Sequence, residues 1–204
     1  MIRKSLWVLG FIFLASCSLN RSEPLVYGSL PAFELVNQLG QPVSLKNYQG
    51  KVWVANFIFT SCAGTCPMLT QRMKKVQEAI EGMGAATDLP LRIVSFSVDP
   101  ERDTPEKLAQ YAQSFRTNPK IWTFVTGPLD KVTETVVKGF KISMGKVPVQ
   151  PGQKLKPGEI FDVVHGEKFI LIDEKGQIRG YYDSDPSGVQ KLIADLKYLY
   201  KKIS

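Results

Sequence analysis

Nearly continuous apolar runs stand out first in the hydropathy pattern of the chain. The segments 51–59 (KVWVANFIF), 91–98 (LRIVSFSV) and 121–127 (IWTFVTG) each indicate a strand that is buried on both faces. Two further runs, 169–173 (FILID) and 177–182 (QIRGYY), flank a short Glu-Lys-Gly segment. This arrangement predicts a tight hairpin in the last part of the chain.

Helical periodicity alternates with these strands. From Thr65 onward apolar residues recur at helical spacing, until two glycines end the predicted helix. Asp103 or Thr104 is expected to cap a second helix, because a proline follows directly and prolines favour the first helical turn. The pattern also predicts a short helix over 129–139 and an amphipathic helix over 186–203.

The remaining segments complete a fold prediction. Two short apolar segments within 33–45 predict an N-terminal hairpin, and the segment 143–159 is rich in Gly, Pro and Lys and predicts a long loop. Strands and helices alternate in the middle, and a hairpin and a helix come last. This order predicts an α/β fold of the thioredoxin-like sandwich type, with a central mixed sheet flanked by helices.

The first residues have the character of an export signal. Arg3 and Lys4 precede the apolar run 5–16, which is too short to cross a bilayer. The run ends in Leu-Ala-Ser-Cys, which resembles a bacterial lipobox and makes Cys17 the expected lipid attachment point. An ordinary signal peptide and an uncleaved anchor are the alternatives.

The lipobox divides the chain into three expected parts. Residues 1–16 form a signal peptide of the lipoprotein type, 17–30 form a tether, and 31–204 form the domain. We therefore expect an exported protein that a lipid anchor holds on a bacterial membrane, with its domain outside the cytoplasmic membrane. The composition, with 44% hydrophobic and 22% charged residues, is that of one folded domain.

The net charge of +7 adds little to this picture. The lysines are scattered, and no basic stripe with interleaved aromatic residues indicates nucleic-acid binding. A mildly basic surface of this kind serves solubility, and could also favour an anionic lipid surface or an acidic protein partner. We expect a monomer.

Cys62 and Cys66 are the candidate chemical centre. The stretch FTSCAGTCPMLT places them four residues apart, where the first central strand gives way to a helix. Helix N-terminal N–H groups and the helix dipole favour thiolate on such a pair, and side chains at this spacing can close a disulfide or hold one ion. Two inert buried thiols or a purely structural disulfide are the alternatives.

His165 is the only histidine of the chain and lies just before the strand 169–173. In a thioredoxin-like sheet, the loop that enters this strand faces the end of the first central strand, so a third ligand is geometrically possible. Two thiolates and one imidazole suit Cu(I) or Cu(II) better than Zn(II), which prefers four ligands or an open water position. Met68 and Met144 could add a thioether, although core or loop positions explain each of them.

Three separated motifs together resemble the Sco/SenC family. These are the Cys-x-x-x-Cys-Pro of FTSCAGTCPMLT, the segment SVDPERDTPEKLAQYA, and His165 ahead of FILID. The resemblance spans 31–200 and implies a thioredoxin fold that binds copper through Cys62, Cys66 and His165. It also implies a role in assembling the dinuclear copper centre of cytochrome c oxidase, with the copper-bearing subunit and a copper donor protein as partners.

Two positions depart from the family pattern. Ala63 stands where the family often has proline, and Val164 stands where an acidic residue often precedes the histidine. A missing carboxylate removes a group that could orient the imidazole, so Cu(II) affinity is expected to be weaker, unless Asp162 compensates. Asp99 and Asp103 are assigned to a strand-end turn and a helix cap rather than to a hard-metal or acid/base site.

Two functions fit these residues. The first is a metallochaperone that passes copper to an oxidase subunit by ligand exchange. The second is a thiol–disulfide oxidoreductase, in which Cys62 attacks and Cys66 resolves the mixed disulfide. The three-residue spacing and the lack of a proline before FILID favour the first, and a peroxidase is disfavoured because no Pro-x-x-x-Thr-x-x-Cys pattern surrounds Cys62.

Overall fold

The computed structural model describes residues 22–62, 64–84, 89–147, 162–165 and 167–204. The strands in these ranges are β1 (Gly28–Ser29), β2 (Glu34–Asn37), β3 (Pro42–Ser44), β4 (Val52–Ile58), β5 (Leu91–Ser97), β6 (Trp122–Thr126), β7 (Met144–Val147), β8 (Asp162–His165), β9 (Lys168–Ile172) and β10 (Gln177–Asp183). The helices are η1 (Leu45–Tyr48), α1 (Thr65–Glu81), α2 (Pro105–Ser114), α3 (Leu129–Thr133), its continuation η2 (Glu134–Gly139), and α4 (Pro186–Ile203).

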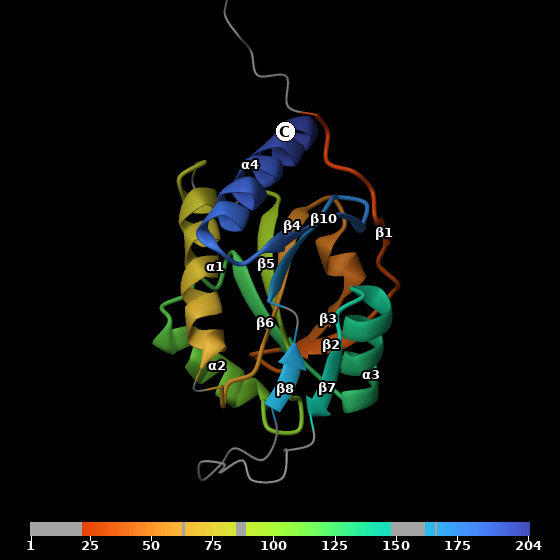
Figure 1. The fold of residues 1–204 in the computed structure, drawn as a ribbon, viewed down its shortest axis with the longest axis vertical. Helices are drawn as coiled ribbons and strands as arrows, with labels where there is room; N and C mark the ends of the chain where they lie inside the picture. Colours follow the sequence, from red (N-terminus) through yellow and green to blue (C-terminus); the bar gives the residue numbers. More distant parts are fainter. Residues whose placement is uncertain (1–21, 63, 85–88, 148–161, 166) are drawn as a thin grey trace, which may run out of the picture.

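A mixed eight-stranded sheet forms the centre, with the strand order β1-β10-β9-β4-β5-β6-β2-β3. The three middle strands β4, β5 and β6 are parallel, and the outer pairs are antiparallel. Helices α1, α2 and α4 cover one face of the sheet, and α3 with η2 covers the other (Figure 1). The predicted thioredoxin-like sandwich with its N-terminal hairpin, β2–β3, is confirmed.

Every residue of β4 is buried, because the strand has a core on each side. Val52, Val54 and Ile58 pack under α1 and α4, while Trp53 and Phe57 face the opposite core. Side chains alternate between the two faces of a strand, so a strand inside a two-sided core needs an unbroken apolar run. This requirement explains why the run was visible in the sequence.

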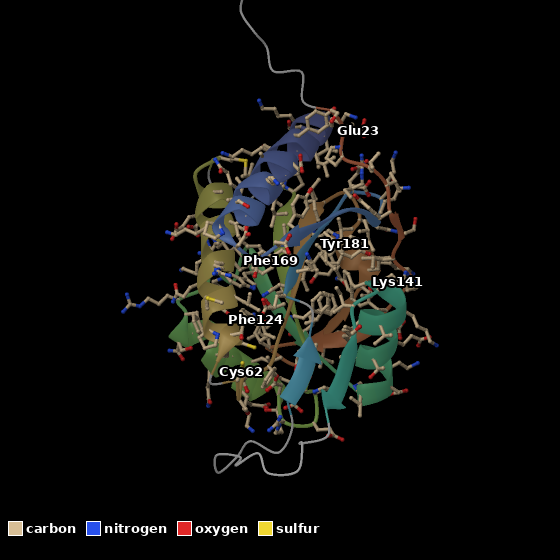
Figure 2. All side chains as sticks on the ribbon, viewed as in Figure 1. Glu23, Cys62, Phe124, Lys141, Phe169 and Tyr181 are labelled. Carbon is tan, nitrogen blue, oxygen red and sulfur yellow. The ribbon has the colours of Figure 1, made fainter. Side chains whose placement is uncertain are left out.

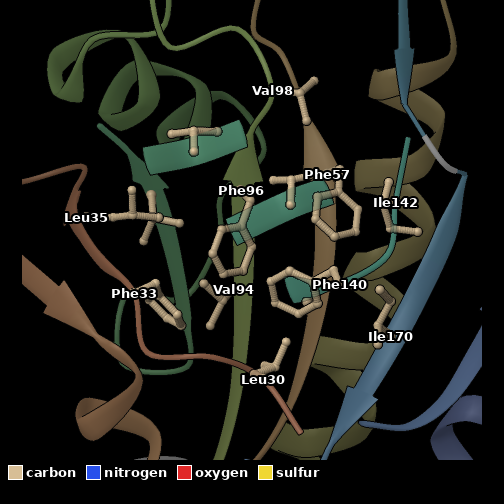
Figure 3. Close-up of a cluster of buried hydrophobic side chains, with 14 of the residues drawn as sticks. Leu30, Phe33, Leu35, Phe57, Val94, Phe96, Val98, Phe140, Ile142 and Ile170 are labelled. Atoms are coloured by element: carbon tan, nitrogen blue, oxygen red, sulfur yellow. The ribbon is translucent and has the colours of Figure 1, made fainter. Parts of the chain in front are cut away.

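The core on the α3–η2 side is built from aromatic rings. The ring of Phe140, just after η2, lies 4.9 Å from that of Phe96 and 5.4 Å from that of Phe57 between centroids (Figure 3). The ring of Trp53 lies 6.1 Å from that of Phe140. Edge-on arrangements of this kind add to the stabilisation from burial alone. The half-buried Cys62 and Met144 pack against the same core, so this core helps to fix the position of Cys62.

The helix ends follow the sequence signals closely. α1 begins at Thr65 and its C-cap is Gly82, and Thr104 caps α2 by accepting a hydrogen bond from the Lys107 backbone N–H. Pro105 occupies the first turn of α2, as predicted. The short helix over 129–139 is present as α3 and η2, whose last residues adopt a wider, π-helical turn.

The predicted long loop over 143–159 is wrong at its start. Residues Met144–Val147 form β7, which pairs antiparallel with β8 in a separate two-stranded sheet. A four-residue strand is too short to show a periodicity, and only its pairing partner reveals it. The rest of the predicted loop, from 148 onward, lies outside the described residues.

The first turn of α4 packs directly on the end of β10, which generates a stability prediction. A Cβ added at Gly188 would lie 2.0 Å from the carbonyl oxygen of Asp183. Gly188→Ala should therefore lower the free energy of unfolding by about 1–3 kcal/mol, measured by urea denaturation. Gln190→Ala, at an exposed neighbouring position, is the control, and its free energy of unfolding should stay near that of the wild type. Equal urea midpoints for the wild type and both variants would contradict the close contact between position 188 and the Asp183 carbonyl.

Candidate metal centre

The cysteine pair lies where the carboxyl end of β4 leads into α1. After Ile58 the chain makes a turn in which the Cys62 N–H donates to the Phe59 carbonyl at 3.3 Å, and α1 then begins at Thr65. Cys66 and Pro67 lie in the first turn of α1. Backbone N–H groups there have no partner within the helix, so a proline costs no helical hydrogen bond. The two cysteines thus lie at the end of the central strand, as the sequence predicts.

The two thiols differ in exposure. Cys66 is fully buried, whereas Cys62 is half-buried and packs against the edge of the core on the α3–η2 side. No disulfide joins them, and the Cys66 backbone N–H donates to Cys62 Sγ at 3.3 Å. The outer sulfur therefore takes the place of a side-chain cap at the start of α1, where the N-cap residue is Gly64.

Burial raises the pKa of the Cys66 thiol well above its ordinary value, and the neighbouring Cys62 raises it further. The expectation that the helix start favours thiolate on both cysteines is therefore wrong for Cys66. Loss of water around the inner sulfur outweighs the favourable helix N-terminus. A soft metal ion that binds both sulfurs must displace this proton, so binding at Cys66 releases a proton.

Asp103 is a residue whose role the sequence did not reveal. It is fully buried, and its carboxylate accepts from the Thr60 N–H at 3.1 Å, from Thr60 Oγ1 at 2.6 Å and from Ser97 Oγ at 2.6 Å. Thr60 is two residues before Cys62, and Ser97 ends β5. Asp103 therefore fastens the turn that carries Cys62 to the neighbouring strand.

The helix-cap assignment for Asp103 is consequently wrong, since Thr104 alone caps α2. The one available signal was that Thr104-Pro105 already supplies a complete helix start and leaves Asp103 without a local partner. The strand-end assignment of Asp99 is confirmed: its carbonyl accepts the N–H groups of Arg102 and Asp103, and its carboxylate pairs with Arg102.

A polar pocket of about 400 Å³ opens beside the cysteine turn. Thr60 and Ser61 form one wall, and residues of α2 form the other: Lys107, Gln110, Tyr111 and Ser114. The Tyr111 hydroxyl shares a 2.7 Å hydrogen bond with Thr70 Oγ1, which links α2 to α1. The turn before Cys62 is thus reachable from solvent along the α2 side.

The backbone of His165 lies at the same edge of the sheet. β9 runs antiparallel to β4, with Ile170 opposite Ala55 and Ile172 opposite Trp53, so β9 begins where β4 ends. β8 directly precedes β9, and its last residue His165 pairs with Met144, which packs on the same core as Cys62. The expected convergence of the three segments therefore holds for the backbone, although His165 lies on a strand rather than in a loop.

The ligand assignment itself stays a prediction. The side chains of His165, Val164 and Asp162 lie outside the described part, as do Ala63 and Cys17. Among the side chains that the structure describes, no three from His, Cys, Asp and Glu gather around a common point. Met144 is half-buried against the core beneath the turn, whereas Met68 is exposed on α1.

Comparison with known proteins decides the family. The SCO1/SenC family model matches residues 27–201, which is most of the chain. This protein belongs to the SCO1/SenC family. Homologues in this family bind copper and take part in cytochrome c oxidase assembly.

Three relatives illustrate the similarity. The SCO1 protein homolog of Bacillus subtilis is 33% identical over 190 residues, covering 92% of this chain and 91% of that protein. The crystal structure of a SCO1/SenC family lipoprotein from Bacillus anthracis is 34% identical, with a TM-score of 0.72 over 86% of this chain and 96% of that one. The structure of Bradyrhizobium japonicum ScoI with copper bound is 25% identical, with a TM-score of 0.66 over 84% and 98%.

In the described part of this Sco protein, no helix combines the length and the hydrophobicity that crossing a bilayer requires.

The buried carboxylate generates a prediction for the Sco protein. Asp103→Asn keeps the shape of the side chain but replaces one carboxylate oxygen by an NH2 group. The groups of Thr60 and Ser97 around it all donate to the carboxylate, so at least one of them loses its acceptor. The free energy of unfolding should fall by about 1–3 kcal/mol, measured by urea denaturation at neutral pH. Glu34→Gln, on an exposed position of β2, is the matched control and should leave the free energy of unfolding unchanged.

The difference in the free energy of unfolding between the wild type and Asp103→Asn should also change with pH, in one predictable direction. Burial raises the pKa of Asp103 above its ordinary value, despite the hydrogen bonds from Ser97 and Thr60 that lower it. The folded state therefore holds the proton more tightly than the unfolded chain, and this stabilisation is complete below about pH 3.9 and is lost as the pH rises through the raised pKa. Relative to Asp103→Asn, the wild type should gain stability on acidification; a gain on raising the pH would contradict the burial.

Proposed function

We propose that this Sco protein is a metallochaperone that carries copper and delivers it to the copper-bearing subunit of cytochrome c oxidase. The observation that carries the proposal is the pair of unbridged sulfurs at the start of α1, with a half-exposed Cys62 over a buried Cys66. A sulfur that solvent reaches can accept an ion from a donor, and a second sulfur behind it can retain the ion. The copper-binding family homologues support the same function.

The donor set fits copper as cargo. Two thiolate sulfurs favour a soft ion such as Cu(I), and an imidazole beside them also suits Cu(II). We propose Cys62, Cys66 and His165 as the ligands, because the β4–β9 and β7–β8 registers bring the backbone of all three to one edge of the sheet. The oxidase subunit then takes the ion by replacing these ligands one at a time with its own.

A second candidate function is the reduction of a disulfide in the oxidase subunit or another exported protein. The difference in exposure between the two thiols favours it, since the outer one can attack and the inner one can resolve. Cys62 as thiolate would attack the target disulfide, form a mixed disulfide and release one target thiolate. Cys66 would then give up its proton, close the Cys62–Cys66 disulfide and release the second target thiolate, so that two electrons pass to the target.

We also propose that residues 1–16 are a signal peptide and that Cys17 carries a lipid, which places the domain 31–204 outside the cytoplasmic membrane. The basic residues, the apolar run and the small residues before Cys17 support this division. One similar solved structure is that of a family lipoprotein, which agrees with it. Of the expected tether 17–30, only the residues before Ser22 then join the lipid to the domain, because Glu23 is bound to Arg179 and β1 pairs with β10.

His165→Ala separates the two functions. Loss of one of three ligands should weaken copper binding by at least about a hundredfold, while the thiols should still reduce a model disulfide at the wild-type rate. Copper affinity is measured by competition with a chelator of known affinity, and reduction by release of a chromogenic thiol.

Two controls make this result specific. Lys168→Ala, on the neighbouring strand, should bind copper as the wild type does. Cys62→Ser should lose both activities, because it removes a ligand and the attacking thiol, and the remaining Cys66 is buried. Copper binding that is unaffected by His165→Ala would refute the three-ligand site.

Lipid attachment is tested in growing cells with a radioactive fatty acid. The wild type should incorporate the label, and Cys17→Ala should not, because the thiol of Cys17 is the proposed attachment point. The variant should also leave the membrane fraction, since a twelve-residue apolar run is too short to span a bilayer. A wild type without label, or a labelled variant, would refute the anchor.

A further inference from the structure

The first described residues are fastened to one end of the domain. The Glu23 carboxylate accepts from Arg179 Nη2 at 2.7 Å and from Lys202 Nζ, and the Pro24 carbonyl accepts from Arg179 Nη2 at 2.7 Å. Arg179 is buried on β10 and also pairs with Asp173 at 2.9 Å. The hydrogen bonds from Lys202 and Arg179 lower the pKa of Glu23 to about 2, so this carboxylate is ionised at any physiological pH.

This end is opposite to the cysteine pair. The register places Ile178, next to Arg179, across from Ile172, which in turn lies across from Trp53 near the start of β4. The seven residues of β4 then lead away to the edge where Cys62 lies. Figure 2, in which the longest axis is vertical, shows Glu23 at the upper end and Cys62 in the lower half.

The same end exposes apolar and basic side chains together. Leu25, Val26 and Tyr27 are consecutive, and their exposed fractions are 70%, 54% and 59%. The last turns of α4 beside this segment expose Lys197 and Lys201, which are four residues apart and lie on one helix face. Apolar side chains next to lysines are typical of surfaces that rest on anionic bilayers.

The length of chain before this end limits its distance from a lipid on Cys17. Cys17 is five residues before Ser22, the first described residue, and five residues of fully extended chain reach about 18 Å at most. Because Glu23 is fixed to β10 and α4, this short length of chain limits how far that end of the domain can move from the lipid. A lipid on Cys17 would keep this end, and no other, beside the bilayer.

We propose that the end formed by Leu25–Tyr27 and the C-terminal turns of α4 lies on the surface of an anionic membrane, and that the cysteine pair faces away from it. This orientation rests on the lipid anchor of the proposed function. It holds the copper site about one domain length above the lipid headgroups, where a recipient domain that projects from the membrane can reach it.

The test uses the full-length lipoprotein with Cys62→Ser and Cys66→Ser, so that one introduced thiol can carry an environment-sensitive fluorophore. The label is placed at Ser204→Cys, at the end of α4, or at Gln110→Cys, which is exposed on α2 beside the cysteine turn. Each protein is reconstituted in vesicles of phosphatidylcholine and phosphatidylglycerol that contain a lipid with a spin-labelled headgroup. The label at 204 should lose most of its fluorescence by contact with the quencher, and the label at 110 should lose almost none.

Charge reversal gives a matched pair of variants. Lys197→Glu with Lys201→Glu should reduce the quenching at 204, because both charges then repel the anionic headgroups. Lys107→Glu with Lys131→Glu makes the same change of net charge on exposed lysines of α2 and α3, and should leave the quenching unchanged. Circular dichroism confirms that both variants are folded.

Mass spectrometry of the N-terminal peptide distinguishes a failure of the lipid anchor from a failure of the proposed orientation. A lipidated protein with equal quenching at 204 and 110, or with stronger quenching at 110, overturns the orientation and leaves copper carriage untouched. Equal effects of the two charge reversals overturn the role of the lysines. A peptide without lipid overturns the anchor and this orientation with it, whereas copper affinity is measured separately on the wild type.

Discussion

The burial of β4 on both faces is the constraint on which the rest of the structure depends. Its side chains alternate between the core under α1 and α4 and the aromatic core around Phe140, so the strand can neither slip nor turn without exposing one of them. The parallel pairing with β5 and the antiparallel pairing with β9 then fix what lies at its carboxyl end. The cysteine turn, the start of α1 and the approach of β8 are all consequences of that one placement.

Asp103 fixes the conformation of the turn that follows β4 and carries Cys62. A loop between a strand and a helix carries backbone N–H groups that the sheet does not satisfy, and here a buried carboxylate accepts one of them together with two hydroxyl groups. Asp103 lies between β5 and α2, so the β5–α2 unit fixes the loop that joins β4 to α1. The position of Cys62 therefore depends on a residue 37 positions beyond Cys66 in the chain.

Sequence reasoning succeeded where a local pattern states the whole physical requirement. The apolar run of β4, the Thr104-Pro105 start of α2 and the amphipathic face of α4 are each complete within a few residues. It failed where the partner is distant. The strand β7 exists because residues 162–165 pair with it, the role of Asp103 depends on Thr60, and the raised pKa of Cys66 depends on how deeply the folded chain covers it. For the proposed copper ligands, the residue types are visible in the sequence, and the backbone register shows that their segments reach the same edge of the sheet.

The nested arrangement of the two thiols also determines how the protein responds to peroxide. Cys62 is the sulfur that a dissolved oxidant meets first, and Cys66 is shielded behind it. A sulfenic acid formed on Cys62 lies against a second thiol of the same chain, which condenses with it and expels water. The internal disulfide that would form in this way is reversible by thiols, unlike the sulfinic and sulfonic acids that further oxidation of a lone thiol gives.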